Sequence, residues 1–505
     1  MFVSDHWHSE LKFDNLRRRL RAMPMLFVTL LFIAGILLAN SFIMPLWCAI
    51  TVAIVALLGA VLSMPRRVAY AYLSMAIVLM GYLAVEARSV ISDIPHNKVV
   101  EMKVSVVSPI ARREGYSVAE GRVEAWHDSE LWHKTDERVQ LWLRTDTLHY
   151  GDRAHIVGSV KERISKYESY NNLMHRRGYI GGVSLSNSNI LGLERDATGG
   201  LRRYAIESLD RYATDSASHS VVSAMVAGSR HMMSPELRST YSVTGLAHLM
   251  AVSGLHLGIV LLVVNVLLSP LRLIHRGHLV CSLLAIILVW LFAVMSGASP
   301  SVVRAAIMVS VLQLSHILSP HYNSLNALFV TLFAMLFYRP DYLFDISFQL
   351  SALAVLGILS WALPLIKIIS FGGVAKALIT TVVVGIVATL WTLPIISYAF
   401  GSIPLIGVVA TPVVLLFAYI VVGAGIFVLL LPHPLSMPFG YIAEWAASLQ
   451  NYVVEWLSAL PFASVEYRAS EVVIILYYIV FIAITVVVWS INRKKELTLS
   501  YDIDE

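Results

Sequence analysis

Runs of about 20 apolar residues recur through most of the 505-residue chain, and each is long enough to span a bilayer as a helix. Charged residues make up only 14% of the chain. A soluble protein usually carries about 25%. The sequence therefore predicts a polytopic α-helical membrane protein with about 10 to 11 transmembrane helices, and it excludes an ordinary soluble enzyme.

The first three apolar segments cover about residues 25–40, 43–64 and 68–85, within a region of three membrane helices at 25–88. A basic leader, residues 1–24, precedes them without a small-residue cleavage site, so we expect a first span and not a removed signal peptide. The basic runs "RRRLR" and "PRR", and "NRKKE" near the C-terminus, predict that both ends lie in the cytoplasm. The expected location is the inner, or cell, membrane, with the lipid bilayer as one partner.

Residues 89–215 are far more polar than the apolar segments, and their pattern is typical of short strands. The segments "KVSVVSPI", "YSVAEGRVEAW", "RVQLWLRT" and "DRAHIVGSV" alternate apolar with polar residues, between Gly, Asp and Pro. This pattern predicts one small extracytoplasmic all-β domain. A five-stranded OB-like barrel and a generic β-domain both fit it.

The rest of the chain is again mostly apolar. We divide it into a polar or amphipathic lead-in at 216–240, a membrane core at 241–432, an amphipathic interfacial segment at 433–470, and a last helix with a short tail at 471–505. Helices are predicted at about 243–268, 279–296, 302–318, 324–338, 346–366, 374–396, 404–432 and 472–491. Between 400 and 470 three topologies remain open: a re-entrant hairpin at 403–431, a second crossing segment, or an interfacial helix carrying Trp445 and Trp456.

Cysteine use and net charge exclude several classes of site. Cys48 and Cys281 both fall in apolar segments, which argues against a disulfide framework or a zinc site. We expect no metal and no cofactor. The net charge of +5 is modest, and by itself it does not indicate a nucleic-acid partner.

Three polar residues interrupt the apolar stretch "GLAHLMAVSGLHLG": His248, Ser253 and His256. On a continuous helix His248 and His256 would lie about 80° apart, and Ser253 about 60° from His256. All three could then share one face. Gly254 and Gly258 would permit a close helix approach or a broken helix. Such residues could line a pore, or Ser253 and a histidine could form a nucleophile pair; the stretch contains no carboxylate to orient that pair.

Two further stretches place polar groups in apolar helices. In "SGASPSVVRAAIM", Arg304 could meet a phosphate or a carboxylate, or extend to the membrane interface. In "RPDYLFDISFQLSALAVLGI", Asp345 and Gln349 lie four apart on one face. Asp345 could pair with Arg304, but we favour a role as the N-cap of the helix that follows.

In this order the three stretches resemble the signature of the ComEC-type competence family of membrane channels. The matching segments are "GLAHLMAVSGLH", "SGASPSVVRAA" and "DISFQLSALAVLG". "SYNNLMHRRGYIGGVSL" is also similar to the segment that closes that family's OB-like outer domain. The resemblance implies a channel that conducts single-stranded DNA during natural transformation. It also implies a periplasmic or extracellular DNA-delivery protein and a cytoplasmic ATP-driven helicase or translocase as partners.

On this resemblance, the pore candidates are His248, Ser253, Gly254, His256, Arg304, Asp345 and Gln349. The candidate DNA contacts of the outer domain are Arg153, Lys161, Arg163, Lys166, Arg176 and Arg177, with Trp126, Trp132, Trp142, Tyr167 and Tyr170 as aromatic platforms. Longer members of the family carry a metallo-β-lactamase-like domain with an H-x-H-x-D-H motif, which does not occur in this sequence. We therefore expect no hydrolase activity. The alternatives are an intramembrane Ser/His enzyme and a transporter or flippase of lipid or another polymer.

Overall fold

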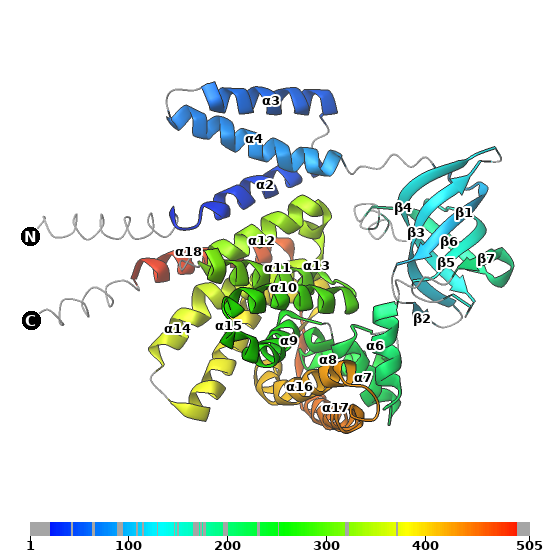
Figure 1. Cartoon of the computed structure of the whole chain (residues 1–505). Helices are drawn as coiled ribbons and strands as arrows, with labels where there is room; N and C mark the ends of the chain where they lie inside the picture. Colours follow the sequence, from blue (N-terminus) through cyan, green and yellow to red (C-terminus); the bar gives the residue numbers. More distant parts are fainter. Residues whose placement is uncertain are drawn as a thin grey trace, which may run out of the picture.

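A computed structural model shows a helical body with a β-domain at its side (Figure 1). The described residues are 21–41, 44–62, 66–87, 94–107, 110–113, 116–128, 130–145, 147–148, 151–164, 171, 174, 178–194, 200–229, 233–250, 252–318, 323–369 and 372–491.

Three helices lie where the first three apolar segments were predicted: α2 (Pro24–Ser41), α3 (Leu46–Leu62) and α4 (Arg66–Glu86). The backbones of α2 and α4 approach closely at two glycines. A Cβ at Gly35 would clash with the carbonyl oxygen of Val78, and one at Gly81 would clash with that of Phe32. Small residues at such a crossing let two apolar helices pack tightly in a lipid environment, where no hydrophobic force drives them together.

The β-domain is one seven-stranded sheet among the described residues. Its strands are β1 (Val99–Val106), β2 (Ala111–Arg113), β3 (Tyr116–His127), β4 (Trp132–Arg144), β5 (Arg153–Ser159), β6 (Tyr179–Ser186) and β7 (Ile190–Glu194). A 3₁₀ turn, η1 (Asn187–Asn189), separates the last two. The spatial order is β6-β4-β3-β1-β5-β7, with β2 paired to β3. The β4–β6 pair is parallel, whereas the other strand pairs of this sheet are antiparallel.

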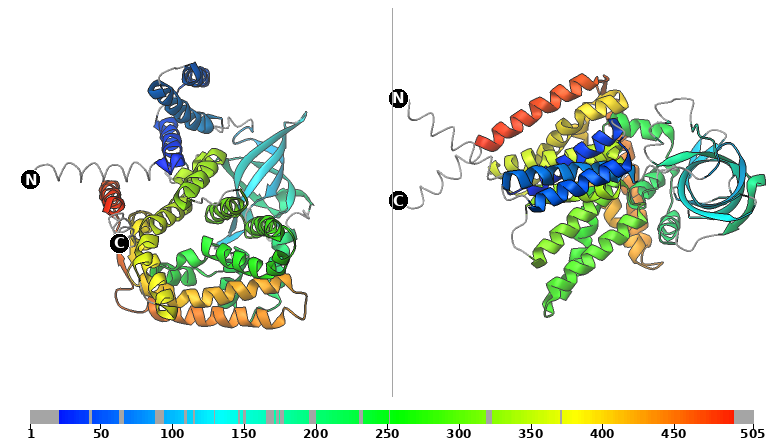
Figure 2. Two further views of the ribbon diagram at one scale, coloured as in Figure 1. Left: turned by 60° about the vertical axis from the view of Figure 1, so that its left-hand side comes forward. Right: turned by 90° about the horizontal axis from the view of Figure 1, so that it is seen from above.

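The sheet curves toward closure. An isolated antiparallel bridge joins Lys161, just after β5, to Gly182 in β6, so the sheet closes between β5 and β6. Seen from above, the strands form a ring (Figure 2). Alternate residues of β1, from Val100 to Val106, point into the buried core, as the period of two in the sequence predicts.

The helical body begins with α6 (Gly200–Asp210), α7 (Ser216–Val226), α8 (Pro235–Val243), η3 (Ala247–Met250) and α9 (Gly254–Leu267). It continues with η4 (Ser269–Leu273), α10 (Gly277–Met295), α11 (Pro300–Leu318), α12 (Ser324–Tyr338), η5 (Pro340–Phe344), α13 (Ile346–Gly357), the π turn η6 (Ile358–Ala362) and α14 (Leu363–Ile368). Last come α15 (Gly373–Phe400), β8 (Ser402–Pro404), α16 (Gly407–Leu430), α17 (Met437–Ser458), β9 (Ser464–Glu466) and α18 (Glu471–Ile491).

One buried core joins helices that are far apart in the sequence. Residues of α7, α9, α10, α11, α16 and α17 all contribute to it. At the other side of the body, α2 packs on α12, where the Thr29 hydroxyl donates to the carbonyl of Phe329 at 3.0 Å. The N-terminal helices are thus attached to the main body through a hydrogen bond that satisfies a buried hydroxyl.

Five helical segments among the described residues are long and apolar enough to cross a membrane: Arg67–Glu86, Gly277–Met295, Ile346–Ile368, Leu378–Phe400 and Gly407–Leu430. Shorter apolar helices occur at Pro24–Ala39, Trp47–Val61, Gly254–Leu267, Pro300–Ser315, Ser324–Tyr338 and Glu471–Val487. The membrane character predicted from composition therefore rests on helices of suitable length.

Residues 403–431 do not form a re-entrant hairpin. They contain one 24-residue helix, α16, which follows the short strand β8. α17 lies beside it, and the two form a helical hairpin (Figure 2). α17 buries small and polar residues against α16 and α7 and exposes Trp445 and Trp456. It is not among the segments apolar enough to cross a membrane, and its exposed tryptophans are typical of an interfacial helix.

Candidate functional site

Residues 244–253 lie between the helices α8 and α9, so the predicted continuous helix from 243 to 268 is wrong. α8 ends with Gly245 at φ +74°, a left-handed conformation that suits glycine. The Leu246 N–H then donates to the Tyr241 carbonyl at 2.8 Å, closing the helix end. A single 3₁₀ turn follows, and α9 starts only at Gly254.

This break separates His248 from the other two polar residues. His248 lies in η3 with an exposed side chain, and its Nδ1 donates to the carbonyl of Gly245 at 3.0 Å. The angles expected for a continuous helix do not apply, because η3 ends at Met250 and α9 begins only at Gly254. The predicted shared helical face is therefore not formed.

Ser253 and His256 are brought together at the start of α9. Ser253 is the N-cap residue, and both its backbone N–H and its hydroxyl oxygen lie 2.9 Å from Nδ1 of His256. Because a backbone N–H can only donate, Nδ1 is the acceptor and the ring proton sits on Nε2. His256 is fully buried, and Nε2 has no hydrogen-bond partner among the described residues.

Arg304 of α11 meets the same end of α9. A Cβ built on Gly254 would lie 3.5 Å from Nη2 of Arg304, an ordinary van der Waals distance. Nη1 of Arg304 donates to the carbonyl of Ser351 in α13, and the hydroxyls of Ser301 and Ser351 are 2.9 Å apart. α9, α11 and α13 therefore converge on this guanidinium. Gly258 has no neighbour within 4 Å of a Cβ position and has no such packing role.

The predicted helix cap at Asp345 is confirmed. Its Oδ1 accepts the Phe348 N–H at 3.1 Å at the start of α13. Gln349 lies one turn on, and its Nε2 donates to the Leu343 carbonyl at 2.8 Å. These two side chains satisfy backbone groups where η5 meets α13, which stabilises the helix end.

Three of the six basic candidates of the β-domain lie among the described residues. Arg153 pairs with Glu124 through Nε and Oε1 at 3.2 Å, and Lys161 and Arg163 are exposed. Lys166, Arg176 and Arg177 lie outside the described residues, as do Tyr167 and Tyr170. Because a carboxylate already partners Arg153, it is a weaker candidate for a phosphate contact than the sequence suggests.

An aromatic–histidine patch, which the sequence indicated only in part, covers the outer surface of β1, β3, β4 and β5. Trp132 is at its centre, 39% exposed, with the Lys103 ammonium 4.8 Å from its ring centroid and the His155 ring 5.4 Å away. The His127 ring lies 5.2 Å from the Trp132 ring, whereas Trp126 is buried in the core and stacks on His133 on the opposite face of the sheet. We use the name for Lys103, His127, Trp132 and His155. Trp142, by contrast, packs against Gly182 and the buried Tyr179 cluster.

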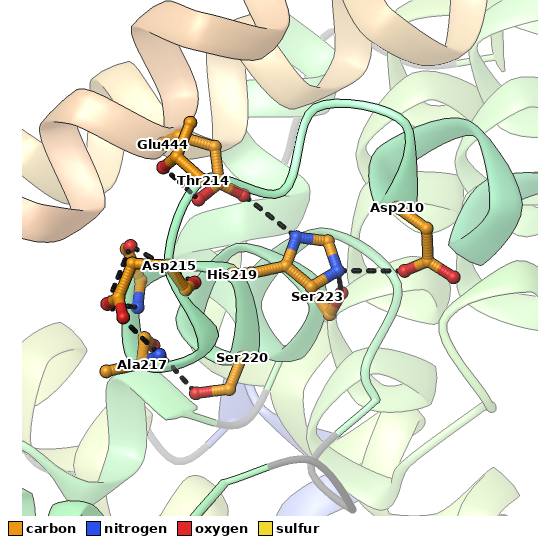
Figure 3. Close-up of polar contacts among 9 residues, drawn as sticks. Asp210, Thr214, Asp215, Ala217, His219, Ser220, Ser223 and Glu444 are labelled. Atoms are coloured by element: carbon orange, nitrogen blue, oxygen red, sulfur yellow. Dashed lines mark hydrogen bonds and ion pairs between the residues drawn. The ribbon is translucent and has the colours of Figure 1, made fainter.

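A buried polar cluster around His219 was not predicted from the sequence (Figure 3). His219 of α7 is held between two carboxylates: Nδ1 lies 2.8 Å from Oε1 of Glu444 in α17, and Nε2 lies 2.8 Å from Oδ1 of Asp210. The Ser223 hydroxyl is 3.3 Å from Nε2, and the Thr214 hydroxyl donates to Glu444 at 3.3 Å. Burial opposes the charged imidazolium, but the hydrogen bonds and charges of Glu444 and Asp210 outweigh it and raise the pKa of His219.

The signal that could have revealed this cluster lies in α17. Glu444, Gln450 and Asn451 sit on the face that carries its small apolar residues, and all three are buried. Gln450 donates to the Tyr241 hydroxyl at 3.0 Å, which in turn donates to Asn451 at 2.7 Å. Polar residues on the apolar face of an amphipathic helix need buried partners. Among the described residues, no group of three or more His, Cys, Asp or Glu is arranged to hold a metal.

A family model described as "Competence protein" matches residues 225–492, which are just over half of the chain and include the whole helical body from α8 to α18. The chain belongs to this competence family. The matched region contains the broken helix at Gly245, the Ser253–His256 contact and Arg304.

Two curated relatives illustrate the extent of similarity to this competence protein. "ComE operon protein 3" of Bacillus subtilis (strain 168) is 30% identical over 245 residues, which cover 48% of this chain and 30% of the relative. An "Uncharacterized protein" of Aquifex aeolicus (strain VF5) is 32% identical over 212 residues, which cover 41% of this chain and 47% of the relative. The matched regions thus span less than half the length of either relative. No solved structure matches the chain.

Proposed function

We propose that this chain acts in DNA uptake during natural transformation, as the cell-membrane channel through which a single strand passes. The observation that carries the proposal is the competence-family match over residues 225–492. The helical body within that match supplies membrane-length helices, which a route across the bilayer requires.

The interruption between η3 and α9 supports a passage in this region. Broken helices at membrane depth are tolerated where their irregular backbone lines a cavity, and their free N–H groups are used for polar ligands. His248, Ser253 and His256 lie at this interruption. We assign them to the lining, with Gly254, Arg304, Asp345 and Gln349 as supporting polar positions.

The β-domain fits an OB-like barrel that meets the strand outside the membrane. Its ring of antiparallel strands contains one parallel pair, β4–β6, and closes through the Lys161–Gly182 bridge. OB folds bind single strands by stacking bases on aromatic side chains beside basic groups. The aromatic–histidine patch, with Lys103 over Trp132, offers both.

We propose that the channel itself performs no chemistry, so that partner proteins deliver the strand and pull it. Both chain ends would lie in the cytoplasm, in agreement with the basic runs that flank the first and last apolar segments. A periplasmic or extracellular DNA-delivery protein would present the strand, and a cytoplasmic ATP-driven helicase or translocase would pull it. Degradation of the other strand would be the work of another active site.

An intramembrane Ser/His enzyme is the second candidate, because the Ser253 hydroxyl lies 2.9 Å from His256. The geometry favours a helix cap instead. Nδ1 already accepts the Ser253 backbone N–H, and no carboxylate among the described residues orients Nε2, whereas a catalytic triad requires one. Covalent labelling of Ser253 by a serine-directed reagent would support the enzyme, and an inert Ser253 would exclude it.

Deletion of the gene, followed by transformation with marked DNA, tests the proposed function. We expect transformants to disappear and to return with the wild-type chain, while His256→Ala restores them poorly despite normal membrane levels. Undiminished transformation in the deletion strain would reject DNA uptake. Altered lipid distribution in that strain would favour the transporter or flippase.

A further inference from the structure

Arg304 is a buried cation without a counter-ion among the described residues. Its side chain is only 5% exposed, although α11 is an apolar helix. Its Nη1 donates to a neutral acceptor, the Ser351 carbonyl, and its Nε has no partner in the part of the chain that the structure describes. The ion pairs in the described part of the chain join other residues. A lone buried charge is costly, so such a group calls for an anion at some stage of function.

The surroundings of Arg304 increase the local positive potential. Nη2 lies against Gly254, the first residue of the 14-residue helix α9. The first N–H groups of a helix have no acceptor within the helix and carry about half a positive charge. Arg304 also lies in the second turn of its own helix, and arginine side chains on helices point back toward the N-terminus. The N-terminus of α9 and one guanidinium thus lie together, an arrangement that suits a bound anion.

We propose that Arg304 and the first turn of α9 bind a phosphodiester group of the transported strand. This inference rests on the proposed function, since it names the chemical group that the passage recognises. A guanidinium presents a planar pair of N–H donors that matches two phosphate oxygens. Gly254 adds no side chain between the guanidinium and the helix end. Arg304 is buried among α9, α11 and α13, and this interior position favours a strand over the headgroup of a surrounding lipid.

The lone charge of Arg304 affects the stability of the unliganded chain. If Arg304 served only to hold α11 against α13, its loss would destabilise the chain. If Arg304 instead serves to bind an anion, its replacement by an apolar side chain of similar length removes the cost of the unpaired charge in the unliganded chain. The unliganded Arg304→Met protein then unfolds at the same temperature as the wild type or higher.

The test uses the full chain in detergent and measures thermal unfolding with and without dimethyl phosphate, a small phosphodiester monoanion. Sodium chloride at equal ionic strength is the reference. We expect dimethyl phosphate to raise the unfolding temperature of the wild type. Arg304→Met should lose this shift, and Arg304→Lys should keep part of it. Arg276→Met, which removes an exposed arginine, should keep all of it. Affinity for dimethyl phosphate should fall about tenfold or more in Arg304→Met, as expected when charge-assisted hydrogen bonds are lost.

Two results would overturn the site. In the first, dimethyl phosphate raises the unfolding temperature of the wild type and of Arg304→Met equally. In the second, dimethyl phosphate does not raise the unfolding temperature of the wild type, and unliganded Arg304→Met unfolds at a lower temperature than the wild type. Two further arms identify the source of the phosphate. Oligothymidylate should stabilise the wild type more than its uncharged methylphosphonate analogue, in an Arg304-dependent way. If phosphatidylglycerol nanodiscs stabilise the chain in an Arg304-dependent way and oligothymidylate does not, the ligand is a lipid and the assignment to the strand fails.

The transformation assay separates this inference from the proposed function. An Arg304-dependent shift in a chain whose deletion leaves transformation intact would support the anion site and reject DNA uptake. Loss of transformation on deletion, with full rescue by Arg304→Met, would support DNA uptake and reject the role of Arg304.

Discussion

His219 Nδ1 lies 2.8 Å from Oε1 of Glu444, a residue 225 positions away, and this contact joins α7 to α17. Asp210 holds the other ring nitrogen, so two carboxylates flank one buried imidazole. Protonation of the ring lets both nitrogens donate, which is the state that this geometry favours.

The raised pKa of His219 predicts that stability depends on pH. The imidazolium contributes stability below its ordinary pKa of 6.5, and this contribution is lost as pH rises through the raised folded-state pKa. We expect the unfolding temperature of the wild type to fall more steeply than that of Glu444→Gln as pH rises above 6.5. Thermal unfolding in detergent measures both slopes. Equal slopes of unfolding temperature against pH in the two proteins would show that the His219–Glu444 contact does not control the pH dependence of stability.

Removal of the Glu444 carboxylate should be strongly destabilising, because it leaves a buried histidine facing one carboxylate and an unfilled space. We expect Glu444→Ala to lower the free energy of unfolding by about 3 kcal/mol. Glu455 lies on the same helix with an exposed side chain, and Glu455→Ala should change stability by no more than about 0.5 kcal/mol. Comparable effects of the two substitutions in chemical denaturation would contradict the buried contact.

The crossing of α2 and α4 predicts opposite results for two Gly→Ala changes. At Gly35 a methyl group would overlap the Val78 carbonyl, so we expect a loss of about 1–3 kcal/mol from overpacking. At Gly258 no atom lies within 4 Å of the new Cβ. There alanine should be neutral, or stabilising by about 0.5–1 kcal/mol through its better helix propensity. Thermal unfolding of both variants checks the pair, and a stable Gly35→Ala protein would rule out the close crossing.

The aromatic–histidine patch predicts a nucleic-acid contact at Trp132. We expect Trp132→Ala to weaken binding of fluorescent oligothymidylate to the full chain about tenfold, the loss of roughly one stacked base. The affinity should also fall as salt rises, because Lys103 accompanies the ring. Trp456→Ala, which changes an exposed tryptophan of α17, serves as the control. Fluorescence anisotropy measures the affinities. Equal affinities of the wild type, Trp132→Ala and Trp456→Ala would show that the patch does not contact the strand.

Local patterns predicted much of the fold. The apolar segments at 25–40, 43–64 and 68–85 became α2, α3 and α4, and four alternating segments became β1, β3, β4 and β5. The strand β6 did not stand out by alternation, because six of its eight residues are buried and its burial pattern is nearly continuous. The cap at Asp345 was also predictable, since an N-cap needs only a short polar side chain at a helix start.

The candidate site was predicted less well, because long-range contacts decide it. Angular spacing assumed a continuous helix through His248 and His256, whereas Gly245 takes a left-handed conformation and ends α8. No spacing rule could pair His219 with Glu444 across 225 residues, or bring Arg304 against Gly254.

The sequence by itself determined the membrane character, the separate β-domain and the identity of the polar residues, because hydropathy and periodicity are local properties of the chain. Only the tertiary structure decided which of those residues meet. Packing of α7 against α17 buries His219 between two carboxylates, and packing of α11 against α9 leaves Arg304 beside a helix N-terminus without a counter-ion in the described part of the chain. Such contacts depend on the mutual fit of distant surfaces, and close packing is a property of the whole fold.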